Sequence, residues 1–249
     1  MEQITAKMPW EGHTEDIPLH LDYFEGSMFD AVKKAADQYP DNTAFTFMGR
    51  ATSYRELIRE IEKCARALKT IGVRENDKVT IALPNCPQAI YMFYAVNLVG
   101  AIANMVHPLS AEKEIEFYLN ESDSVTAITL DQFYHKFESV RSNTKVVNII
   151  IASVKDALSQ PLKAGYMLTE GRKIKKIPKE APVIRWNDFM RLSRACFYNY
   201  RVERRGDDPA VILYSGGTTG KTKGIVLTNL NFNALGAQIV ATNPMYRPG

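Results

Sequence analysis

The stretch that decides the fold covers residues 210–228 and reads AVILYSGGTTGKTKGIVLT. Its first five residues form an apolar run that is typical of a buried strand. Ile225 to Thr228 are again apolar or β-branched, which favours a second strand. Between the two runs, residues 215–224 hold four glycines, four hydroxyl residues and two lysines. We therefore predict a strand, a loop of special composition and another strand.

The composition of this loop suits a bound polyphosphate. Glycines let the backbone approach a ligand closely and turn its N–H groups inward. Hydroxyls can donate to phosphate oxygens or help hold Mg²⁺, and lysines offset the negative charge. A plain polar turn between two strands is the alternative interpretation. The residues predicted to bind phosphate are Ser215, Gly216, Gly217, Thr218, Thr219, Gly220, Lys221, Thr222, Lys223 and Gly224.

The same loop comes within one residue of another phosphate-binding pattern. Residues 215–222 differ from GxxxxGK[ST] only in having Ser215 at the first position. That pattern must open a helix, whose N-terminus then holds the phosphates. Here Gly224 stands where the first helical turn would be, and strand-forming residues follow it. The P-loop NTPase therefore stays a remote alternative.

The composition of the chain excludes several classes of protein. It has 249 residues, 45% of them hydrophobic and 24% charged, with a net charge of +3, which is typical of an ordinary globular protein and gives no argument for nucleic acid. Three scattered cysteines exclude a disulfide framework and a zinc site, and indicate a reducing compartment. The N-terminus has neither a basic start nor an apolar core, so we expect no signal peptide and a cytoplasmic location.

Helical and extended patterns alternate along the chain. Ser27 and Ser53 are placed to cap helices, and the second helix shows an apolar face that includes Leu57, Ile61 and Leu68. We predict helices over 27–39, 53–71, 89–98, 110–119 (capped by Ser110) and 132–140, and strands over 79–83, 101–106, 125–130, 146–151 and 210–214. Apolar strands separated by helices indicate an α/β fold with mostly parallel sheets flanked by helices. Residues 89–106 are long enough for a membrane span, but Gly100 favours a buried helix followed by a strand.

The segment from Lys163 to Arg205 is strongly basic. It holds 12 Lys and Arg against four acidic residues, and its densest part is 172–179. A solvated loop is one interpretation. The other is attraction to an anionic partner, either by peripheral contact with a membrane surface or through a polyphosphate-bearing substrate. The sequence does not decide between them.

The loop resembles the signature of the adenylate-forming (AMP-binding) superfamily, roughly Tyr-(Ser/Thr)-(Ser/Gly)-Gly-(Ser/Thr)-Thr-Gly-x-Pro-Lys-Gly. Tyr214 to Gly224 match it, with Thr222 in place of the usual proline, and Asn229 stands where a histidine is common. Residues 52–57 and 104–114 resemble further elements of the superfamily. The basic segment near residues 171–173 makes the chain most similar to long-chain fatty acyl-CoA synthetases.

The resemblance implies an ATP-dependent acyl-CoA ligase. Such an enzyme joins a carboxylic acid, here a fatty acid, to AMP and then to CoA, with ATP, Mg²⁺ and CoA as cofactors or co-substrates. It implies catalytic roles for Thr218, Thr219 and Lys223, and a Mg²⁺ contact for Ser215. It also implies that 1–249 is the N-terminal region of an AMP-binding domain. We expect a main subdomain over about 75–228, and the start of a second one from about 20–74 with 229–249.

The later motifs of the superfamily do not occur in these 249 residues. We therefore expect a truncated chain or an interrupted gene, no acyl-adenylate formation by this part alone, and weak affinity for ATP. We also expect Leu57, Ile61 and Leu68 to be left partly uncovered, which would favour self-association. The alternative function is a non-catalytic nucleotide- or phosphate-binding fragment, or an interaction module.

Overall fold

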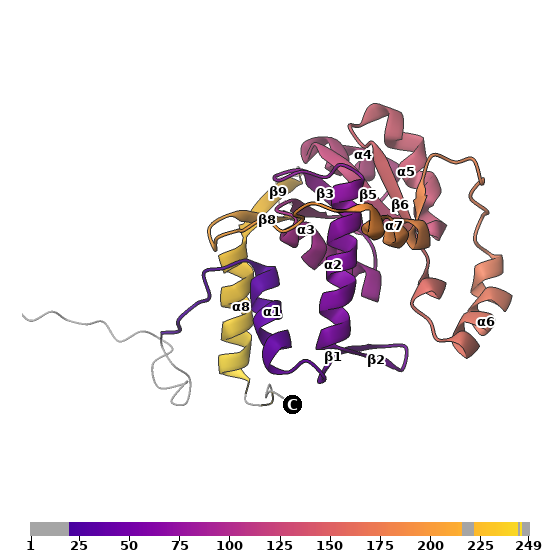
Figure 1. Ribbon diagram of the computed structural model, residues 1–249. Coiled ribbons are helices and arrows are strands. Elements are labelled where there is room, and N and C mark those ends of the chain that lie inside the picture. The colour runs from indigo at the N-terminus through magenta and orange to yellow at the C-terminus, as the bar shows by residue number, and fades with distance from the viewer. Residues whose placement is uncertain (1–19, 216–221, 244, 246–249) are drawn as a thin grey trace, which may run out of the picture.

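The computed structural model describes residues 20–215, 222–243 and 245. Within them, a seven-stranded sheet has the order β7-β6-β5-β3-β4-β8-β9, and all of its neighbours are parallel except β8 and β9 (Figure 1). A separate antiparallel pair is formed by β1 and β2. The strands are β1 (Thr43–Phe47), β2 (Arg50–Ser53), β3 (Lys78–Ala82), β4 (Ile102–Met105), β5 (Ser124–Leu130), β6 (Asn148–Ala152), β7 (Ile184–Arg185), β8 (Pro209–Ser215) and β9 (Lys223–Thr228).

Helices cover both faces of the sheet, as predicted. Buried residues of α1, α2, α3 and α7 form one hydrophobic cluster, and buried residues of α4 and α5 form a second one. The α/β fold with a mostly parallel sheet is therefore confirmed. The helices are α1 (Met28–Gln38), α2 (Tyr54–Thr70), α3 (Pro87–Leu98), α4 (Glu112–Glu121), α5 (Tyr134–Val140), α6 (Gln160–Leu168), α7 (Trp186–Leu192) and α8 (Asn229–Thr242).

The helix ends follow from local chemistry. The hydroxyl of Ser27 accepts from the Asp30 amide at 3.0 Å, and that of Ser53 accepts from the Glu56 amide at 3.2 Å, which satisfies amides that have no partner inside their helix. The prediction for Ser110 was wrong by one residue. Ala111 precedes α4, and its amide donates to the Glu114 carboxylate at 2.9 Å.

Residues 89–106 form a helix and a strand rather than a membrane span. After α3 the chain turns at Gly100, whose φ of +77° is a conformation that glycine adopts without strain, and then it enters β4. In the described part of the chain, no helix is both long and apolar enough to cross a bilayer.

The expectation that α2 would be partly uncovered is wrong. Leu57 is 4% exposed, and Ile61 and Leu68 are 0% exposed. The reason is that α2 packs against α3 and α7, which bury its apolar face within this stretch of chain. The same cluster contains residues from both sides of position 75, and α8 lies beside α1 (Figure 1). The subdomain division stays a prediction.

Candidate functional site

The predicted strand–loop–strand is an antiparallel hairpin at the end of the sheet. Tyr214 faces Gly224, and Ser215 faces Lys223, in the register of β8 and β9. β9 begins at Lys223, so a strand stands there and not the helix that the P-loop pattern calls for. Six of the predicted phosphate-binding residues lie outside the described residues: Gly216, Gly217, Thr218, Thr219, Gly220 and Lys221.

The described members of the loop are placed on its two flanks. Ser215 and Thr222 are half-buried, whereas Lys223 is exposed and forms no ion pair with any described residue. A hydroxyl and an ammonium group thus stand at facing positions where the loop leaves and re-enters the sheet. This arrangement offers one hydrogen-bond donor and one positive charge to an anion at the loop.

Gly224 is closely packed between two side chains of β8, and its backbone angles do not call for glycine. A Cβ at this position would lie 3.3 Å from Cγ2 of Ile212 and 3.4 Å from Cε1 of Tyr214. The ring of Tyr214 packs against Gly224 across the hairpin, at a distance that is an ordinary contact even for an added Cβ, whereas Ile212 would have to give by a few tenths of an ångström. This contact fixes the last residues of β8 immediately before the loop.

Tyr214 is held on its other side by α4. Its hydroxyl donates to the Tyr118 carbonyl at 3.3 Å, and the two ring centroids are 4.2 Å apart. Burial raises the pKa of Tyr214 to about 12, so the phenol is neutral at physiological pH. A fully buried Asn104 in the adjacent strand donates to Thr80 at 2.8 Å and to Ser122 at 2.9 Å.

The end of β8 at Ser215 lies at the edge of the sheet where ligands bind in open α/β folds. The carboxyl ends of parallel strands meet at one edge, and β3, β4 and β8 are neighbours there. Asn85, His107 and Ser215 stand at or just beyond these three ends. His107 is exposed, and its Nδ1 accepts from the Leu109 amide at 3.2 Å. The structure therefore puts this histidine at the candidate edge.

An apolar cavity of about 560 Å³ opens next to the ends of β3 and β4. Its lining includes Phe45, Cys86, Phe93, Tyr94 and Met105. Burial raises the pKa of the Cys86 thiol, which keeps it protonated and a poor nucleophile. The cavity is therefore suited to apolar contact and not to covalent chemistry.

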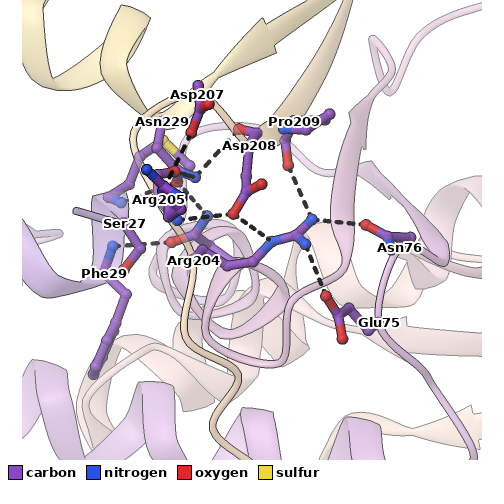
Figure 2. Close-up of polar contacts among 12 residues, drawn as sticks. Ser27, Phe29, Glu75, Asn76, Arg204, Arg205, Asp207, Asp208, Pro209 and Asn229 are labelled. Atoms are coloured by element: carbon purple, nitrogen blue, oxygen red, sulfur yellow. Dashed lines mark hydrogen bonds and ion pairs between the residues drawn. The ribbon is translucent and has the colours of Figure 1, made fainter. Parts of the chain in front are cut away.

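The end of the hairpin opposite the loop is anchored by a buried pair of amide side chains, Asn229 (labelled in Figure 2) and Asn97. Asn229, 0% exposed, accepts from the Met28 amide at 3.1 Å and from Nδ2 of Asn97 at 2.7 Å. The side chain of Asn97 in turn accepts from the Phe29 amide at 3.0 Å. Two distant side chains thus satisfy the first two amides of α1.

Asn229 also donates to the segment that leads into β8. Its Nδ2 reaches the carbonyls of Arg205 at 2.9 Å and Asp208 at 3.3 Å. All four hydrogen-bonding positions of the side chain are therefore used. The sequence marked Asn229 only as a departure from a common histidine, and the buried polar network around it was not predicted.

Arg204 ties the same segment to the start of β3 (Figure 2). Its guanidinium, 6% exposed, pairs with Glu75 at 3.0 Å and donates to Asn76 at 2.8 Å. It also donates to the Pro209 carbonyl at 3.4 Å. The two networks together fix both strands of the hairpin at the end opposite the loop.

The residues present fit Mg²⁺ only as an ion carried by phosphates. No three His, Cys, Asp or Glu side chains gather into a metal-binding group in residues 20–215, 222–243 and 245. Ser215 offers one hydroxyl at the loop. Mg²⁺ in phosphate sites keeps several waters and takes few protein ligands, so one hydroxyl is compatible with its chemistry.

Comparison with known proteins identifies the family. The family described as "AMP-binding enzyme" matches residues 32–247. The chain belongs to this family. A long-chain-fatty-acid–CoA ligase of Bacillus subtilis (strain 168) is 31% identical over 231 residues, which cover 92% of this chain and 41% of that protein.

Solved structures show the same fold. A long-chain-fatty-acid-CoA ligase from Archaeoglobus fulgidus has a TM-score of 0.68 and 23% identity, and the match covers 89% of this chain and 40% of that one. An anthranilate CoA ligase in complex with anthranoyl-AMP also has a TM-score of 0.68, at 22% identity, over 88% of this chain and 37% of its own. This AMP-binding chain therefore spans about two fifths of the length of these proteins.

Proposed function

We propose that this chain is the N-terminal, triphosphate-binding part of an ATP-dependent acyl-CoA ligase. The observation that carries the proposal is the β8–β9 hairpin, which presents Ser215 and Lys223 at facing positions beside the carboxyl edge of the parallel sheet. The family match over residues 32–247 supports it, and so do relatives named as ligases.

The proposed reaction has two steps. A carboxylate oxygen attacks the α-phosphorus of ATP, the bond to the bridging oxygen of the β-phosphate breaks, and pyrophosphate leaves with the electron pair. The CoA sulfur then attacks the acyl carbon, and AMP leaves. AMP is needed because a carboxylate alone has a poor leaving group.

The loop would act on the first step. Lys223, with the amides and hydroxyls of Gly216 to Gly220, would stabilise the charge that develops on pyrophosphate. Thr218 and Thr219 would donate hydrogen bonds, and Ser215 would contact Mg²⁺, which lowers the charge repulsion among the phosphates when it is bound.

The substrate we propose is a long-chain fatty acid. The apolar cavity beside the ends of β3 and β4 is chemically suited to an aliphatic chain, and the Bacillus subtilis relative is named for such substrates. All three cysteines are free, and two of them are buried, which supports a reducing compartment and thus the cytoplasm.

The experiment titrates the 249-residue chain with MgATP and, separately, with inorganic tripolyphosphate. Isothermal calorimetry measures the affinity for each ligand. Lys223→Ala should weaken both ligands by roughly tenfold to a hundredfold, because it removes a charge-assisted hydrogen bond. Lys145→Ala is the control, since Lys145 is an exposed lysine that lies before the amino end of β6. Equal affinities for the two variants would contradict the proposal.

The second candidate is phosphate binding by these residues without catalysis. Isotope exchange between pyrophosphate and ATP can exclude the second candidate. We expect none from this chain alone, so that triphosphate binding without exchange fits both candidates for the isolated chain. Exchange above background would show that these residues suffice for adenylation, and would exclude the second candidate.

A further inference from the structure

A basic arm projects from the β7 side of the sheet, away from the hairpin (Figure 1). We define it as residues 160–180, which include α6 and the chain that leads back towards β7. It carries six Lys and Arg against two Glu. None of the residues assigned above to phosphate or nucleotide binding belongs to it.

Most of the positive charge of the arm is not neutralised within the protein. Lys173 pairs with Glu170 at 2.7 Å. Arg172, Lys175, Lys176 and Lys179 are exposed, and they form no ion pair with any residue that the structure describes. A cluster of unpaired cations on a projecting segment attracts an anionic partner.

Large apolar side chains are exposed beside these cations. On α6, Leu162 is 48% exposed, Met167 is 53% exposed and Leu168 is 62% exposed. Leu162 and Leu168 lie more than half exposed or nearly so on this helix of nine, whereas Met167 also lines the cavity described below. Exposed apolar residues next to lysines are the composition of segments that lie in the interface of a bilayer.

A cavity of about 470 Å³ separates the arm from the sheet. Its lining includes Lys155, Lys175, Lys176, Lys179 and Arg185, with Asp131 as the single acidic residue. The cavity is therefore positively charged and large enough for a phosphate-bearing headgroup.

We propose that the basic arm docks on a membrane surface that contains anionic phospholipids. The lysines contact lipid phosphates, and Leu162 and Leu168 enter the headgroup region. A soluble polyanion explains the charge but leaves the apolar residues without a role. A nucleic acid would add stacking on aromatic rings, and the arm has one aromatic residue, the half-buried Tyr166.

The experiment is co-sedimentation of the 249-residue chain with phosphatidylcholine vesicles, with and without phosphatidylglycerol. We expect binding only where phosphatidylglycerol is present. Raising the salt from about 0.1 M to about 1 M should reduce it strongly, because the Debye length falls from about 10 Å to about 3 Å. Equal binding to neutral vesicles, or none to either kind, would overturn the proposal.

The variants locate the contact. The triple change Lys175→Gln, Lys176→Gln and Lys179→Gln should lower the partition coefficient roughly a hundredfold, since each cation near an anionic surface contributes about 1 kcal/mol. Lys34→Gln, Lys113→Gln and Lys145→Gln change the net charge equally on other surfaces and should have little effect. Equal losses in the two triple variants would exclude the arm as the contact.

The apolar residues are tested separately. Leu162→Ser and Leu168→Ser together should reduce the binding that persists at high salt and leave the salt-sensitive part in place. These positions are exposed, so the fold should be unaffected, and circular dichroism checks this. Binding to inorganic polyphosphate with no binding to vesicles would assign the arm to a soluble anion instead, and would overturn the membrane proposal.

Discussion

The centre and the hairpin end of the same sheet differ in what covers them. At the centre, α2 and α3 bury side chains such as Ile61 and Met92 completely. At the hairpin end, Val226 on β9 is 55% exposed, and Leu235 and Val240 on α8 are 52% and 57% exposed. Both regions are apolar in sequence. The difference shows that an apolar strand or helix is buried only where the chain supplies a second layer.

Of the substitutions that test this comparison, one at the centre of the sheet should change the free energy of unfolding most. Ile61→Ala should lower the free energy of unfolding by about 2–5 kcal/mol, because it leaves a cavity under close-packed neighbours. Val226→Ala should change it by no more than about 0.5 kcal/mol. Urea denaturation with an unchanged m-value measures both. Equal losses would mean that β9 is covered in solution.

The next effect is expected at Asn229, the buried residue at the start of α8. Asn229→Ala leaves the Met28 amide and Nδ2 of Asn97 without their acceptor, and should destabilise the fold by about 2–4 kcal/mol. Asn231→Ala is the matched control, since Asn231 is exposed and accepts from the Thr228 amide at 2.9 Å. It should cost about 1 kcal/mol. A larger loss at Asn231 would contradict the assigned roles.

A smaller, pH-dependent effect is expected at Tyr214, on the strand between centre and edge. Its pKa is raised from 10.0 to about 12 by burial, so the folded state keeps the phenol proton where the unfolded state has lost it. Stability should therefore fall as the pH rises above about 10 and be unaffected at neutral pH. Tyr214→Phe should weaken this alkaline loss, as followed by denaturation and tyrosinate absorbance.

Part of the loss of stability at alkaline pH should persist in the Tyr214→Phe variant. Burial raises the pKa of Tyr91 to about 12 as well, so this residue contributes in the same direction. An alkaline stability curve that Tyr214→Phe leaves unchanged would mean that water reaches the phenol freely.

The smallest effect on stability is expected at the edge itself. Val226→Lys should leave the unfolding free energy nearly unchanged but reduce self-association, because unpaired edge strands with apolar residues pair with other chains. Light scattering at increasing concentration measures it. Val147→Lys, at a position 66% exposed beside β6, is the control and should not change association. Similar changes in self-association in both variants would show that β9 is not the contact between chains.

Much of the fold could be predicted because its signals are local. Serines at 27 and 53 cap helices, Gly100 separates α3 from β4, and Gly224 followed by strand-forming residues indicates a hairpin instead of a helix. These features depend on neighbours within a few residues, and so the sequence states them directly. The identity of the loop as a phosphate-binding candidate has the same origin.

The burial of α2 and the amide network could not be predicted from such signals. Leu57 has the same character in sequence whether or not α3 and α7 cover it. Asn229 reaches across 132 residues to Asn97 and across 201 residues to Met28. Nothing near Asn229 in the sequence indicates these partners.

The sequence by itself determined the types and ends of the elements, the α/β class and the chemistry of the loop after Tyr214. Tertiary structure alone decided which apolar faces are covered, which polar side chains are buried in pairs, and that the basic arm projects with its leucines exposed. The physical reason is one of range. Backbone propensity and capping act within one or two turns, whereas burial and long-range hydrogen bonds depend on which distant segments the folded chain brings together.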